Sequence, residues 1–293
     1  MYHLSNKELN YLESLQDDLG SNAYLLGIIN KQTHSSEVMF ISLTNKFNLH
    51  SRLVIEQSNP SEILKIFNLP GLKQFIVVTR FGMIKLFDFS SGQIQITDHI
   101  VLTREYIETA IMILNQSILT VVCQNRMINL EIIYDKHTKR ALRIKKTRII
   151  PLDEPVNNII KISEDQLGYC DEAGNFGLLT VPCKFNGNKM MKKTTKVCNF
   201  PVDNVFILES KPNDKLKYRT DIIELLMINY EGRICVFNLK KRKRQSHNDP
   251  KLVKDICLNS QNIIITKRSA IKTDLMILSD KTLKKLIIDR NDN

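Results

Sequence analysis

The fold of this chain is decided by Arg80–Gly92, which reads RFGMIKLFDFSSG. Gly82 opens an alternation of apolar and polar residues that runs from Met83 to Phe89, and a Ser-Ser-Gly sequence closes it. An alternation with a period of two is typical of a β-strand with one buried face, and clusters of Gly and Ser mark turns. The stretch therefore predicts one strand between two turns.

The same outline returns five more times in the 293 residues. Tyr230–Leu239, which reads YEGRICVFNL, repeats the turn glycine, the alternating run and the aromatic residue followed by Asn. Weaker copies begin near Glu37, Arg126, Gly174 and Lys281, so consecutive copies lie about 44 to 58 residues apart. A unit of four strands with its turns occupies about 40 to 50 residues. The period therefore predicts one four-stranded unit for each copy.

β-Branched runs precede four of the six copies and predict a second strand beside each of them: Leu72–Thr79, Ile118–Val122, Ile222–Asn229 and Thr273–Leu278. Each run and the copy that follows it would form a hairpin. Units of this size, made of strands alone, indicate an all-β chain with the blades of a β-propeller.

These residues resemble the WD-repeat propeller family. In that family the third strand of a blade carries an Asp-Gly turn, an alternating run, Trp-Asp and a Thr-Gly-like turn; Phe81-Gly82, Phe87-Asp88 and Ser91-Gly92 stand at the matching places. The chain has no Trp and no Gly-His pair, and Phe237-Asn238 is the other pair at the Trp-Asp place. The resemblance extends as a pattern over about residues 21 to 290. It implies a highly divergent propeller of six to seven four-stranded blades, because many members of the family have seven.

The N-terminal segment has a helical pattern instead. Ser5 and Glu8 have the spacing of a capping box, and Leu9, Leu12 and Leu15 follow at helical spacing before Gly20. We therefore expect a short helix over about residues 6 to 17. The predicted organisation is an N-terminal helical segment, residues 1–20, and a single β-propeller domain, residues 21–293.

Composition limits the fold and the cellular compartment that we expect for the protein. With 43% hydrophobic residues the chain can bury a sizeable core. Its six cysteines contain no Cys-x-x-Cys pair, which favours buried free thiols in a reducing compartment. The first twenty residues have neither a signal-peptide nor an Arg-rich transit pattern, and no apolar run reaches about 18 residues, so we expect no membrane insertion.

The net charge of +11 favours acidic partners, and the basic residues are clustered. The first run is Lys136, Lys139, Arg140, Arg143, Lys145, Lys146 and Arg148, and the second is Lys184, Lys189, Lys192, Lys193 and Lys196. Both runs, like a third at residues 240–244, begin soon after a predicted third strand, where a blade turns into its outermost strand, so the three runs could form one surface on the rim. One interpretation is a docking site for nucleic acid or an acidic protein surface, with Lys139, Arg140, Arg143, Lys145, Lys146, Lys189, Lys192 and Lys193 as its residues. The other is that lysines protect exposed edge strands from aggregation.

A third basic cluster has the form of a nuclear import signal. Lys240, Lys241, Arg242, Lys243 and Arg244 are consecutive and lead into a polar loop, as an accessible signal requires. It predicts a nuclear protein, and a cytoplasmic protein with a solvated basic loop is the alternative.

Catalytic patterns do not occur in this sequence. The six histidines are scattered without metal-ligand spacing, and there is no glycine-rich phosphate loop and no Gly-x-Ser-x-Gly turn. We expect no catalytic residue, cofactor or metal. The predicted function is a non-catalytic scaffold for other protein subunits in a larger, nuclear assembly. The alternatives are a nucleic-acid-binding module with a basic rim and a cytoplasmic membrane-trafficking or coat subunit.

Overall fold

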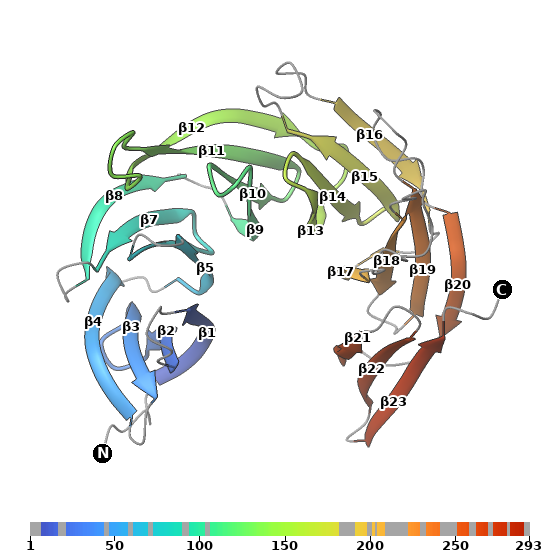
Figure 1. Ribbon diagram of the computed structural model, residues 1–293, viewed down its shortest axis with the longest axis horizontal. Helices are drawn as coiled ribbons and strands as arrows, with labels where there is room; N and C mark the ends of the chain where they lie inside the picture. Colours follow the sequence, from blue (N-terminus) through green and yellow to red (C-terminus); the bar gives the residue numbers. More distant parts are fainter. Residues whose placement is uncertain are drawn as a thin grey trace. The chain divides into compact units, whose positions relative to one another are not determined.

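Six antiparallel sheets follow one another along the chain in the computed structural model (Figure 1), which describes residues 7–16, 22–43, 47–57, 61–69, 73–89, 94–102, 106–181, 191–197, 201–202, 204–208, 222–228, 233–240, 251–257, 262–268, 272–279 and 282–289. Within each sheet the strands are hydrogen-bonded in the order of the sequence. This meander is the topology of a propeller blade. The chain divides into two compact units, residues 1–152 and 153–293.

Unit 1 contains the first three sheets, and each of them has four strands. The first sheet consists of β1 (Lys7–Gln16), β2 (Asn22–Asn30), β3 (Ser35–Leu43) and β4 (Phe47–Gln57). The second consists of β5 (Ile63–Leu69), β6 (Gln74–Thr79), β7 (Met83–Asp88) and β8 (Gln95–Val101). The third consists of β9 (Ile107–Ile113), β10 (Ile118–Cys123), β11 (Arg126–Tyr134) and β12 (Ala141–Pro151).

Unit 2 contains two further four-stranded sheets and, among the described residues, one sheet of three strands. The fourth sheet consists of β13 (Val156–Ser163), β14 (Gln166–Asp171), β15 (Asn175–Thr180) and β16 (Met191–Lys196). The fifth consists of β17 (Asn204–Leu208), β18 (Ile222–Ile228), β19 (Arg233–Lys240) and β20 (Lys251–Cys257). The sixth consists of β21 (Asn262–Arg268), β22 (Lys272–Ser279) and β23 (Thr282–Asp289).

The repeated outline of the sequence marks the third strand of every sheet. The copies that begin near Glu37, Gly82, Arg126, Gly174, Gly232 and Lys281 coincide with β3, β7, β11, β15, β19 and β23. The four β-branched runs coincide with β6, β10, β18 and β22, each paired with the third strand that follows it. Gly82 and Gly174 occupy the hairpin turns at φ of 84° and 78°, where a side chain would be strained. The prediction of an all-β chain built from four-stranded units is therefore confirmed.

The prediction of a helix over residues 6 to 17 is not confirmed, because the structure has strand β1 at Lys7–Gln16. This strand pairs with β2 along its length, with a register shift between Leu9 and Tyr11 that interrupts a simple alternation. Tyr11 packs against the core that the first two sheets share. A helix of about twelve residues is marginal by itself, whereas pairing with β2 satisfies the backbone groups of both strands. Tertiary pairing thus overrides the local helical pattern.

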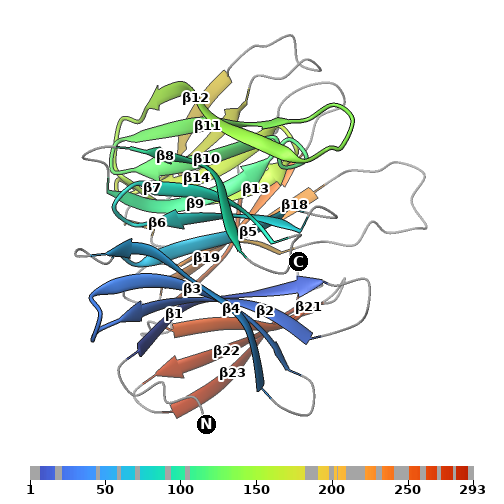
Figure 2. The same ribbon diagram turned by 90° about the vertical axis from the view of Figure 1, so that its left-hand side faces the viewer.

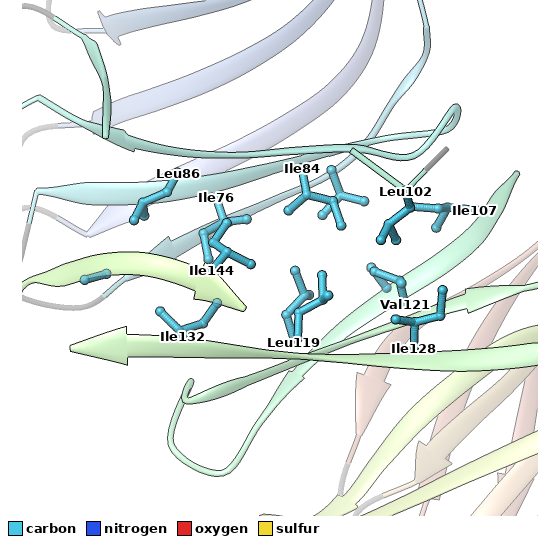
Figure 3. Packing of buried hydrophobic residues seen from close by; sticks show 14 of the residues in the cluster. Ile76, Ile84, Leu86, Leu102, Ile107, Leu119, Val121, Ile128, Ile132 and Ile144 are labelled. Atoms are coloured by element: carbon cyan, nitrogen blue, oxygen red, sulfur yellow. The ribbon is translucent and has the colours of Figure 1, made fainter. Parts of the chain in front are cut away.

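Aliphatic side chains fill the space between the second and third sheets (Figure 3). Ile84 of β7 and Leu119 of β10 are both completely buried, and Figure 3 shows side chains of the two sheets facing each other across this layer. Complete burial of an aliphatic side chain is worth roughly 1.5 to 3 kcal/mol relative to exposure. This layer therefore holds the two sheets face to face.

The first and second sheets share an aromatic core. Phe75 of β6 and Phe87 of β7 stack with ring centroids 5.0 Å apart, and both are completely buried. Leu25 and Val38 of the first sheet belong to the same cluster. Figure 2 shows the β5–β8 sheet between the other two sheets of unit 1. Phe87, at the place of the family's Trp, is thus a buried aromatic anchor between sheets.

Glu37 is a completely buried carboxylate in the first sheet. Its side chain accepts hydrogen bonds from Asn30 Nδ2 at 2.9 Å, Ser35 Oγ at 3.0 Å and Arg52 Nε at 2.7 Å. Burial alone would raise the pKa of Glu37, but these donors and the charge of Arg52 outweigh it and lower the pKa to about 2. Glu37 is therefore ionised at neutral pH and stabilises the fold above its ordinary pKa, an effect that is lost as the pH falls toward 2.

In unit 2 the fourth and fifth sheets are joined by a smaller cluster. Phe176 and Leu178 of β15 pack with Val205 of β17, and the thiol of Cys170 is buried among them. Cys123 and Cys170 are both buried and form no disulfide, as predicted for them. The remaining cysteines lie outside the residues whose side chains the structure describes.

Replacing a core leucine of the third sheet should destabilise the protein far more than replacing an exposed one. Leu119→Ala leaves a cavity in the layer of Figure 3 and should lower the free energy of unfolding by roughly 2 to 5 kcal/mol. Leu142→Ala makes the same chemical change in β12 at a residue that is 51% exposed, and it should change the value by less than about 0.5 kcal/mol. Urea unfolding of both variants measures the difference, and equal effects would contradict the assigned packing.

Candidate interaction surface

The turn between β11 and β12 has a fixed conformation. Asp135 Oδ1 accepts hydrogen bonds from the backbone N–H of His137 at 3.0 Å and of Thr138 at 2.7 Å. These donors, with the Thr138 hydroxyl, hold the pKa of Asp135 below its usual value. Lys139 adopts a left-handed conformation with φ of 60°, and its N–H donates to the carbonyl of Asp135 at 3.0 Å. The turn thereby presents Lys136 and Lys139 to solvent.

Two side chains of the second sheet anchor the beginning of β12. The buried amide of Gln74 donates from Nε2 to the carbonyl of Ala141 at 3.0 Å and accepts the Ala141 N–H at Oε1 at 2.8 Å. Arg140, the residue before, forms an ion pair with Asp88 at the end of β7. The carboxamide thus pairs with the Ala141 backbone as a neighbouring strand would.

A third anchor lies farther along β12. Asp98 of β8 accepts the Ile144 N–H through Oδ2 at 2.7 Å. Figure 1 shows β8 beside β12, in agreement with the contacts between the two strands. Ile144 itself is buried in the layer between the sheets. The first half of β12 and the residue before it are therefore held by one residue from each of β6, β7 and β8.

The second half of β12 is exposed and strongly basic. Every residue from Lys145 to Ile149 is exposed, and the strand contains no acidic residue. Its four cations are Arg143, Lys145, Lys146 and Arg148. None of these four forms a salt bridge with any residue that the structure describes. The anchored strand therefore presents four exposed cations that form no ion pair with the described residues.

The pairing of β12 with β11 distributes these cations over both faces. Arg143, Lys145 and Arg148 lie opposite Ile133, Glu131 and Asn129, which alternate along β11 and so share one face. Lys146 lies opposite Leu130 on the other face. Because the strand order is β12-β11-β10-β9, β12 is an edge strand of its sheet. Positive charge therefore surrounds an edge.

The aromatic residue that lies opposite Ala141 of β12, Tyr134, is already engaged. The hydroxyl of Tyr134 donates to the carbonyl of Gln116 at 2.8 Å. Burial raises the pKa of Tyr134 to about 12. A half-buried ring with a bonded hydroxyl is a poor platform for stacking a nucleic-acid base.

The second basic run lies partly on β16, the edge strand of the fourth sheet. Lys192 forms an ion pair with Asp153, with Nζ and Oδ2 2.7 Å apart, and Lys193 is exposed. Lys189 lies outside the described residues. Since β12 is in unit 1 and β16 is in unit 2, a surface shared by the two runs stays a prediction.

The described part of the third cluster is short. Lys240 is the last residue of β19, and Lys241, Arg242, Lys243 and Arg244 lie outside the described residues. Its role as an import signal therefore stays a prediction.

Sequence reasoning included Arg140 among the docking residues; the structure pairs it with Asp88, and its docking role stays a prediction. It missed Gln74 and Asp98, because a side chain that pairs with a distant strand leaves no local pattern. Asp88 had a signal: it stands at the place of the family's Trp-Asp, and its carboxylate binds the next sheet. An exposed pair, Phe81 and Tyr106, was also missed; their rings lie 6.0 Å apart, edge to face.

Comparison with known proteins supports the fold. No family model matches the sequence, and no curated protein matches it. Among solved structures, the β-propeller domain of Cps50 (Swd1) from Myceliophteria thermophila is similar, with a TM-score of 0.60 and 9% sequence identity over 97% of this chain and 90% of that one. The chain thus has the fold of a β-propeller, as the resemblance of its third strands implied.

Loss of the Gln74 amide should loosen the anchored end of β12. Gln74→Met keeps the length of the side chain but leaves the buried N–H and C=O of Ala141 without their partners, so the free energy of unfolding should fall by roughly 1 to 3 kcal/mol. Lys139→Ala, in the exposed turn of the same hairpin, should change it by less than about 0.5 kcal/mol. Urea unfolding checks both variants, and a stable Gln74→Met protein would contradict the anchoring role.

Proposed function

We propose that this chain is a non-catalytic β-propeller scaffold that mediates protein–protein interactions within a larger, nuclear, multi-subunit assembly. The observation that carries the proposal is strand β12, a basic edge that side chains of three other strands hold in place. A rigid strand with exposed charge is suited to binding a partner protein and needs no catalytic groups for that role. The fold, shared with the propeller domain of Cps50 (Swd1), is consistent with this role.

Several observations support a non-catalytic role. Among the described residues, no three His, Cys, Asp or Glu side chains gather as metal ligands would. Complete burial strongly raises the pKa of the Cys170 thiol, so it is not a ready nucleophile. The buried carboxylate of Glu37 forms an ion pair with Arg52. Its pKa of about 2 is far below the pKa that a general base needs at neutral pH.

Protein partners are favoured over nucleic acid. The proposed binding residues of unit 1 are Lys139, Arg143, Lys145, Lys146 and Arg148, and Lys192 and Lys193 are those of unit 2. Single-stranded nucleic acid is bound by stacking as well as by charge, and the ring of Tyr134 is engaged in its own sheet. In the part of the chain that the structure describes, no helix is long and apolar enough to cross a membrane.

Purification of the tagged full-length chain from its own cells tests the scaffold proposal. We expect a constant set of protein partners that remains bound after nuclease treatment and at raised salt, because interfaces with buried apolar area are less sensitive to salt than phosphate contacts. Mass spectrometry identifies the set. Loss of all partners on nuclease treatment would refute the scaffold proposal in favour of nucleic-acid binding.

The nuclear part of the proposal has a separate test. We expect a fluorescent fusion of the full-length chain to accumulate in the nucleus and a variant with alanine at Lys241, Arg242, Lys243 and Arg244 to remain in the cytoplasm. Microscopy of living cells measures the nuclear to cytoplasmic ratio. A variant with alanine at Lys136 and Lys139 serves as a control for loss of positive charge. Nuclear exclusion of the unaltered fusion would support the cytoplasmic alternative instead.

A further inference from the structure

We propose that the exposed half of β12, residues 145–149, binds an acidic, extended segment of a partner protein as an additional strand on the β9–β12 sheet. This inference rests on the proposed scaffold function and specifies one of its docking sites. It assigns a chemistry to the occupant and a geometry to the contact.

The backbone of β12 determines the geometry. Ile144 donates its N–H to Asp98 and not to β11, so its backbone groups face the outer edge of the strand. Alternate residues of a strand face the same edge, so Lys146 presents its N–H and C=O there as well. Ala141 and Ile144 already have partners from the second sheet, Gln74 and Asp98. Among the described residues, the edge is therefore capped in its first half, whereas in its second half Lys146 has no backbone partner on that side; the register of β12 shifts between Lys146 and Arg148.

The charge of β12 determines the occupant. A second copy of this strand would bring four more cations against the four already present, so pairing between copies is disfavoured. Lysine on an edge thus excludes like-charged strands and admits acidic ones. The carboxylates of an extended peptide that alternate with apolar residues would meet Lys145 and Arg148 on one face of the sheet. The exposed side chain of Ile149 lies opposite Ile128, on the other face with Lys146, and offers an apolar contact.

Backbone chemistry favours a peptide over a nucleic acid at this edge. An open strand edge presents both hydrogen-bond donors and acceptors, and a peptide backbone matches both of them. Phosphate oxygens only accept, so a phosphodiester chain would leave the carbonyl groups of the edge unmatched. The anchors also reduce the cost of binding, because the receiving strand is held in place beforehand.

A synthetic peptide of alternating Glu and Val, with a terminal fluorophore, tests the inference on the full-length protein by fluorescence anisotropy. We expect it to bind at least about tenfold more tightly than the same peptide with Lys in place of Glu. We also expect a version with N-methyl groups on alternate backbone nitrogens, which keeps its charge but loses its strand donors, to bind about tenfold more weakly. Equal binding of the methylated and unmethylated peptides would refute strand addition.

Two matched pairs of substitutions test whether the acidic peptide binds on β12. Lys145→Glu with Lys146→Glu should weaken the acidic peptide about tenfold or more, whereas Lys31→Glu with Lys136→Glu makes the same change of net charge at two exposed residues outside β12 and should weaken it less than about threefold. Equal weakening by the two pairs would refute a site on this strand, as would tighter binding of single-stranded DNA than of the acidic peptide. Unfolding by urea confirms that both variants are folded.

The two proposals fail differently. If the Lys145→Glu, Lys146→Glu protein still recovers its full set of partners from cells, the scaffold function stands and the docking edge is refuted. If the unaltered protein recovers no protein partners, the scaffold function itself is refuted.

Discussion

The structure of unit 1 depends on the burial of one apolar face of each sheet against the next. A four-stranded meander satisfies its inner backbone groups by pairing, but its faces remain apolar and must be covered. Ile84 and Leu119 illustrate the solution: each is completely buried, although they belong to different sheets and lie far apart in the sequence. Once the sheets are stacked, polar side chains such as Gln74 and Asp98 come within reach of the next sheet's edge strand. The anchoring of β12 is therefore a consequence of the packing of its sheet.

The same stacking explains why a charged edge can be retained. A mobile strand with four cations would distinguish poorly between partners, because the positions of its charges would vary over many conformations. β12 is instead bound at Arg140, Ala141 and Ile144 before its exposed half begins. Charge that is held in register with a backbone edge can distinguish an acidic strand from a general polyanion. If the proposed docking is correct, protection from aggregation and selective docking are two results of the same four residues.

Much of the fold was predictable because its signals are local. A turn followed by an alternating run marked the third strand of each sheet, with a glycine in three of the six turns, and a preceding β-branched run marked the second strand in four sheets. The helix expected at the first strand was not confirmed. The helical spacing of Leu9, Leu12 and Leu15 was outweighed by pairing with β2, which no local pattern reveals. For the candidate site, composition alone predicted the exposed cations of β12. It could not separate Arg140, which is bound by Asp88, from Lys145, because an ion pair between residues 52 positions apart depends on the completed fold.

Hydrogen exchange at single-residue resolution along β12 tests the anchored, half-open strand most directly. In the free full-length protein the amides of Ala141 and Ile144 should exchange slowly, since Gln74 and Asp98 accept their protons, while the amide of Lys146 should exchange rapidly. Addition of the protein's purified partner should protect Lys146 and leave Ala141 and Ile144 unchanged. Rapid exchange at Ala141 and Ile144 in the free protein, or a Lys146 amide that stays unprotected in the complex, would contradict the role assigned to this strand.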